Sequence, residues 1–71
     1  MFNGKELKMK MIQKGVGADA LICALGVNES TFYRKLAGKS EFSRSEIQII
    51  RATLKLTVEE ADLIFFAPEL A

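Results

Sequence analysis

Short polar and basic side chains are concentrated between residues 28 and 44, in the segment NESTFYRKLAGKSEFSR. An arginine can donate two hydrogen bonds to the O6 and N7 atoms of guanine, serine and threonine hydroxyls can donate or accept, and a threonine methyl can contact the methyl group of thymine. Lysines, arginines and the free N–H groups at a helix start can bind phosphates. The chemistry available to this segment is recognition of nucleic-acid bases and backbone.

The candidate base-contacting residues belong to a helix expected over residues 28–37. Phe32 and Leu36 are four residues apart and predict a buried stripe, which leaves the opposite face free. The residues expected to contact base edges from that helix are Glu29, Ser30, Thr31 and Arg34. For Glu29 the alternative is structural, because a carboxylate in the first turn is stabilised by the helix dipole.

Other polar side chains of the segment are candidates for contacts with the phosphate backbone. Asn28 is mainly an N-cap. Lys39 and Arg44 precede or begin the next helix, where free N–H groups favour an anion, although a solvated loop is the alternative for both. The expected backbone-contacting residues are Asn28, Tyr33, Lys35, Lys39, Ser40 and Arg44.

Four helix-start signals, and one segment bracketed by Gly17 and Gly26, divide the chain into five elements. Asn3, Ser43 and Thr57 are each followed three residues later by glutamate, the pattern of a capping box. Asn28 is a further N-cap, and no segment shows the alternation typical of a strand. Helices are therefore expected over residues 3–14, 18–25, 28–37, 43–54 and 57–66, which makes an all-α bundle.

Hydrophobic spacing within these helices predicts the core. The segment 18–25 is apolar enough to be a mostly buried helix, and Cys23 is expected to pack within it. The predicted core consists of Leu7, Met11, Leu21, Ile22, Leu25, Val27, Phe32, Leu36, Ile47, Ile50, Leu54, Leu56, Val58, Ala61, Ile64 and Phe65.

Length and composition indicate one folded domain over residues 1–71. Nearly half of the residues are hydrophobic and only one is proline, which is typical of globular proteins. The single cysteine has no intrachain partner and favours a cytoplasmic location. Apolar runs stay short of the roughly 20 residues that span a bilayer, so no membrane segment is expected.

The net charge of +1 is unevenly distributed. Residues 28–51 contain five basic against three acidic residues, whereas residues 52–71 contain one basic against four acidic residues. Such polarity can orient a protein on a polyanion, although ordinary scatter of surface charge is the alternative.

The segment 18–37 has the form of a helix-turn-helix, with Gly26 in the connecting turn LGVN. From about Leu7 to Phe66 the chain resembles the lambda-repressor-like family, the Cro and XRE-type regulators of bacteria and their phages. The resemblance lies in LICALGVNESTFYRKLAGKSEF followed by SEIQIIRATLKLTVEEADLIFF. It implies that residues 28–37 are a recognition helix in the major groove and that the loop from Gly38 to Arg44 meets the backbone.

Three residues depart from the pattern of that family. Ala18 stands where a glutamine commonly bonds a phosphate, and Ile22 replaces a small residue packed against the turn. Lys55 replaces a glycine, at a cost of about 1 kcal/mol if its backbone is left-handed. These departures affect affinity and docking more than the fold.

The resemblance implies a transcriptional regulator, a repressor of phage or mobile-element type that binds palindromic operator DNA as a homodimer. Leu63 and Phe66 are left over from the core and are candidates for the dimer interface; the alternative is that the tail 63–71 folds back over the bundle. A helical protein-binding adaptor, such as an antitoxin-like domain, is the competing function. An enzyme is not expected, because the chain has no histidine and no nucleophile with a base at readable spacing, and no cofactor or metal is expected.

Overall fold

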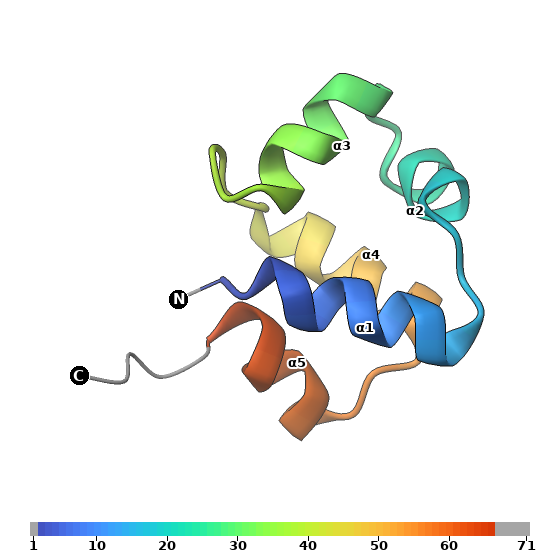
Figure 1. Cartoon of the computed structure of the whole chain (residues 1–71), viewed down its shortest axis with the longest axis vertical. Coiled ribbons are helices and arrows are strands. Elements are labelled where there is room, and N and C mark those ends of the chain that lie inside the picture. Colours follow the sequence, from blue (N-terminus) through green and yellow to red (C-terminus); the bar gives the residue numbers. More distant parts are fainter. Residues whose placement is uncertain (1, 67–71) are drawn as a thin grey trace.

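Residues 2–66 are described by the computed structural model, which is an all-helical bundle (Figure 1). Five helices and no strands occur in this range, and each helix begins and ends within one residue of the predicted bounds. The helices are α1 (Gly4–Lys14), α2 (Ala18–Leu25), α3 (Glu29–Leu36), α4 (Arg44–Leu54) and α5 (Val58–Phe65). The predicted all-α fold class is thereby confirmed.

Helices α1 and α4 form the middle of the bundle. α2 packs on α4, and α1 packs on both α4 and α5. In Figure 1, α3 lies at one end of the longest axis and α5 at the other, with α1 in front of α4 between them. The helix with the candidate base-contacting residues is therefore far from the C-terminal helix.

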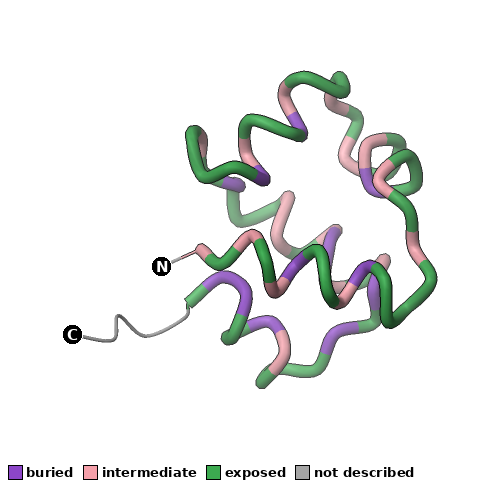
Figure 2. Tube along the Cα trace, in the orientation of Figure 1, coloured by how far each residue is buried: buried purple, intermediate pink, exposed green. Residues whose placement is uncertain are grey.

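The core is formed by apolar side chains from all five helices, and its buried positions face the centre in Figure 2. Two aromatic residues that helix periodicity does not indicate join it, Phe42 from a loop and Phe2 from the N-terminus. The Phe2 and Phe42 rings lie 5.4 Å apart, and the Phe42 and Phe65 rings 6.2 Å apart. These ring contacts hold the loop after α3 against the segment before α1 and against the last residue of α5.

Two residues predicted to be buried are exposed. Val58 is 61% exposed because it directly follows the N-cap of α5, on the first turn. Cys23 is exposed because it lies about 200° around α2 from Leu21, the only residue of this helix that is fully buried. The prediction that α2 is mostly buried was wrong, since Ile22 and Leu25 are only partly buried against the core.

The capping boxes at Ser43 and Thr57 are complete. At Asn3 only one half forms: the side chain accepts from the Glu6 N–H at 3.1 Å, but the Asn3 N–H donates to the Ile64 carbonyl at 2.6 Å. This backbone bond fastens the start of α1 to the end of α5. Lys55 has the left-handed backbone (φ 53°) that glycine adopts most easily.

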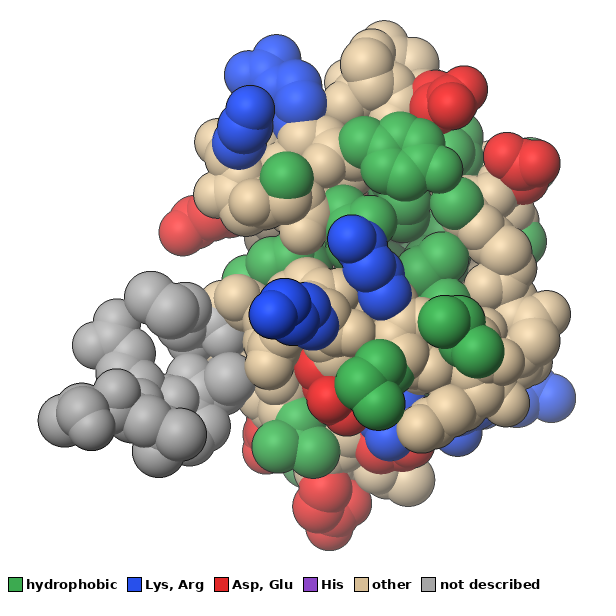
Figure 3. All heavy atoms as spheres, viewed as in Figure 1, with side chains coloured by type: hydrophobic (Ala, Val, Ile, Leu, Met, Phe, Trp, Pro, Cys, Tyr) green, Lys and Arg blue, Asp and Glu red, His purple; other side chains and the backbone are tan. Residues whose placement is uncertain are grey.

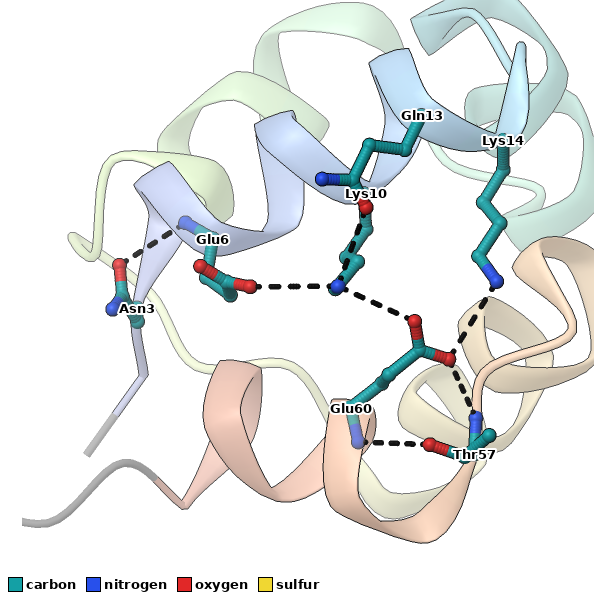
Figure 4. A network of polar contacts seen from close by, with 7 residues as sticks. All are labelled: Asn3, Glu6, Lys10, Gln13, Lys14, Thr57 and Glu60. Atoms are coloured by element: carbon teal, nitrogen blue, oxygen red, sulfur yellow. Dashed lines mark hydrogen bonds and ion pairs between the residues drawn. The ribbon is translucent and has the colours of Figure 1, made fainter.

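A polar network joins α1 to α5, and we call it the α1–α5 network (Figure 4). At its centre the Glu60 carboxylate lies 3.3 Å from the Lys10 ammonium and 3.5 Å from the Lys14 ammonium. The same carboxylate accepts from the Thr57 N–H at 2.9 Å. This backbone hydrogen bond and then the two lysines outweigh desolvation and lower the pKa of Glu60 to about 2.

Candidate nucleic-acid interface

Helix α3 begins at a tight turn and a side-chain cap. Gly26 ends α2 with a left-handed backbone (φ 69°), a conformation that costs little without a Cβ. Two residues later the Asn28 side-chain oxygen accepts from the Thr31 N–H at 2.8 Å and from the Ser30 hydroxyl at 3.2 Å. The start of α3 is thus fixed locally, and the Asn28 oxygen is committed to the cap.

The inner face of α3 is anchored by the two residues predicted for that role. Phe32 is fully buried and Leu36 is 7% exposed. The N-terminus of α1 passes so close to the end of α3 that a Cβ on Gly4 would clash with the Leu36 carbonyl oxygen. The middle and the C-terminal end of the helix are therefore held against the bundle.

The outer face of α3 is open to solvent. Glu29, Ser30 and Arg34 are exposed, and Thr31 is half-buried. Tyr33 is 46% exposed and its ring packs edge-on against Phe32 at 5.3 Å. Ser30 and Arg34 lie opposite the buried stripe with Thr31 beside them, whereas Glu29 is exposed because it begins the helix. We call these four residues together the α3 face (Glu29, Ser30, Thr31 and Arg34).

Beyond the α3 face, basic side chains continue into the loop 37–43. The Lys39 N–H donates to the Arg34 carbonyl at 2.9 Å, which ties the loop to the last turn of α3. Lys39 and Arg44 are exposed and Ser40 is half-buried. Among residues 2–66, no carboxylate forms an ion pair with Arg34, Lys39 or Arg44. Basic side chains stand at this end of the molecule in Figure 3, at upper left.

The exposed chemistry of α3 and its loop consists of hydroxyl groups, a guanidinium, further cations and the carboxylates of Glu29 and Glu41. The hydroxyl groups and the cations can bind base edges and phosphates. No family model, curated protein or solved structure matches this chain. The arrangement of these residues is therefore the basis for assigning a function.

Lys35, expected to contact phosphate, has an internal partner. Its ammonium lies 2.6 and 2.8 Å from the two carboxylate oxygens of Glu46, and the side chains are only 16% and 13% exposed. Burial raises the pKa of Glu46, but hydrogen bonds from Lys35 and Ser43 outweigh it and hold that pKa below its ordinary value. Helix periodicity could not reveal this pair, because its members are eleven residues apart on two helices.

The described residues offer neither a metal site nor a membrane span. Within residues 2–66, no three His, Cys, Asp or Glu side chains are grouped to hold a metal ion. None of the helices in that range has the length and apolarity needed to cross a bilayer.

Of the candidate dimer residues, Leu63 belongs to α5, and Phe66 directly follows α5 and lines a hollow together with Ser40 and Glu41 of the loop after α3. Leu63 is 51% exposed and Phe66 is 64% exposed. The rest of the tail, residues 67–71, lies outside the described residues, so the alternative in which it folds back stays untested.

Proposed function

We propose that this protein is a sequence-specific DNA-binding regulator that places α3 in the major groove. In this proposal α2, the turn at Gly26 and α3 act as a helix-turn-helix. Ser30, Thr31 and Arg34 contact base edges, while Lys39 and Arg44 contact phosphates.

One observation gives the proposal its main support: one face of α3 is buried and the opposite face is exposed to solvent. Phe32 is fully buried, whereas Arg34, two residues away, is exposed and has no ion-pair partner among the described residues. The Arg34 guanidinium is therefore free to donate to a base edge, with the hydroxyl groups of Ser30 and Thr31 beside it. A bidentate arginine–guanine contact contributes about 1–3 kcal/mol of discrimination between bases.

A dimer that binds a palindromic site is part of the proposal. One short recognition helix contacts few base pairs, and two-fold dimers double the site by placing two helices about one turn of DNA apart. The exposed apolar side chains of Leu63 and Phe66 support α5 as the self-association surface.

The experiment that tests this function is selection of binding sites from a random DNA pool by the purified protein. Enrichment of one sequence with an inverted repeat is expected. A pool that stays random after repeated selection, with weak binding that depends only on salt, would contradict sequence-specific recognition.

A protein-binding adaptor is the second candidate, and a specific feature favours it. An apolar hollow of about 470 Å³ opens between α1 and α3, with Ile12 (80% exposed) and Tyr33 on its rim. Apolar side chains gather on the surface between these two helices in Figure 3. The lining residues are Lys8, Met11, Ile12, Gly15, Val16, Gly17, Ala18, Tyr33 and Leu36. Stable binding of a protein partner that Ile12→Glu abolishes, together with failure to select DNA, would favour this function.

A further inference from the structure

The Lys35–Glu46 pair joins three parts of the proposed DNA interface. Lys35 belongs to the last turns of α3, one residue after Arg34, and Glu46 to the first turn of α4. The Glu46 carboxylate also accepts from the Ser43 N–H at 2.8 Å, at the end of the loop 37–43. A single carboxylate therefore holds the end of α3, the end of the loop and the start of α4.

The surroundings of the pair make it rigid. Both side chains are largely shielded from water, and the Lys35 ammonium lies 5.8 Å from the centre of the Phe42 ring. Phe42 is itself buried in the core. Two short hydrogen bonds to a shielded carboxylate are stronger than those of an exposed ion pair.

We propose that Lys35 and Glu46 are positioning residues of the DNA interface, whose ion pair sets the placement of Arg34 relative to Lys39 and Arg44. Arg34 directly precedes Lys35 on the chain, Lys39 follows Lys35 by four residues, and Arg44 lies two residues before Glu46. Correct spacing between base and phosphate contacts fixes the register of a protein on the duplex. The inference depends on the proposed function, because it concerns the same surface.

The two roles open to Lys35 predict opposite results for Glu46→Gln. If Lys35 binds phosphate directly, removing a carboxylate beside it frees the ammonium and removes a negative charge near DNA, so binding becomes tighter. If the pair positions the interface, losing it loosens α3 against α4 and binding becomes weaker. Glutamine keeps an oxygen acceptor for the Ser43 N–H, so the capping interaction survives.

The test measures the affinity of wild type, Glu46→Gln, Lys35→Met and the double variant for a duplex that wild type has selected from a random pool. Each affinity is corrected for the folded fraction obtained from circular-dichroism melting. We expect Glu46→Gln and Lys35→Met each to bind about three- to tenfold more weakly, and the double variant to bind no more weakly than the worse single variant, since the pair acts as one unit.

Glu41→Gln is the matched control, since it removes the same charge from an exposed residue of the neighbouring loop. We expect it to leave binding equal or slightly tighter. Tighter binding by Glu46→Gln, or additive losses in the double variant, would overturn the positioning role. Failure of wild type to select any duplex would instead overturn the proposed function, so the two failures are distinguishable.

Discussion

The α3 face with its following loop and the α1–α5 network use basic residues in opposite ways. In the network, Lys10 and Lys14 both pair with Glu60 of α5. At the other end of the molecule, Arg34 and Lys39 form no ion pair with any described residue. Counting charges by sequence region cannot separate these two uses. The difference teaches that Lys10 and Lys14 serve the fold, whereas Arg34 and Lys39 are available to a partner.

The largest expected effect comes from removing the anchor beneath the α3 face. Phe32→Ala removes a fully buried ring, and such changes cost about 3–5 kcal/mol of unfolding free energy. That is a large part of the stability of a small domain, so both folding and DNA binding should fail. Urea denaturation followed by circular dichroism measures the loss, with Met9→Ala, on an exposed residue, as the control expected to change stability by less than about 0.5 kcal/mol. Equal losses of unfolding free energy in both variants would show that Phe32 does not anchor α3.

Removing one helix cap at each end of the molecule should cause stability losses of intermediate size. Asn28→Ala removes the cap of α3 and Thr57→Ala the cap of α5, and each should cost about 1 kcal/mol of stability. Only Asn28→Ala should also weaken DNA binding, because only that variant frays the start of α3. Thermal melting and titration of a selected duplex check both. If Thr57→Ala weakened DNA binding as much as Asn28→Ala after correction for the folded fraction, α5 would contribute to DNA binding as α3 does.

Two lysines provide a matched removal of one positive charge. Lys39→Ala should reduce the slope of log affinity against log salt by about 0.9 for each protomer bound, the effect of one lost phosphate contact per protomer, and leave stability unchanged. Lys14→Ala should keep the slope and lose about 0.2–1 kcal/mol of stability, because it breaks an ion pair with Glu60. Affinity measured across a salt series, with melting curves of both variants, distinguishes them. If the salt slope fell in Lys14→Ala and not in Lys39→Ala, the phosphate contacts would lie on α1 and not on the loop after α3.

The smallest expected effect is a change in stability at low pH. The pKa of Glu60 is lowered to about 2 in the folded protein, so the stabilisation it provides is present above its ordinary pKa of 4.5 and is lost as pH falls toward 2. Wild type should therefore melt at progressively lower temperature over this range, and Glu60→Gln should show a shallower decline. Glu46, whose pKa is also lowered, remains in both proteins and accounts for part of the decline that persists. Identical pH profiles for the two proteins would show that the network contributes no stability.

Local signals in the sequence predicted the helices well because the starts of α1, α3, α4 and α5 are each encoded within four residues, whereas α2 was placed by the glycines on either side of it. Ser43 and Thr57 form the complete boxes that their spacing predicts, whereas Asn3 instead turns its N–H to the Ile64 carbonyl. The burial of Phe2 and Phe42 escaped prediction because it depends on contacts between distant parts of the chain. Periodicity in fact favoured Val58, which the structure exposes.

The exposed face of the candidate interface could also be predicted from local sequence signals, but its internal ion pair could not. Phe32 and Leu36 determine which side of α3 faces inward, and the exposure of Ser30 and Arg34 follows from helix geometry alone. The internal use of Lys35 did not follow, because Glu46 meets it only once α4 has packed.

The central claim is that Arg34 reads a base, and the most direct test is Arg34→Ala measured on a selected duplex and on its single-base-pair variants. We predict a loss of about 1–3 kcal/mol in binding free energy, relaxed preference at one base pair, and an unchanged melting temperature. Unchanged affinity with every base preference intact would contradict the assignment of the α3 face as the surface that reads DNA.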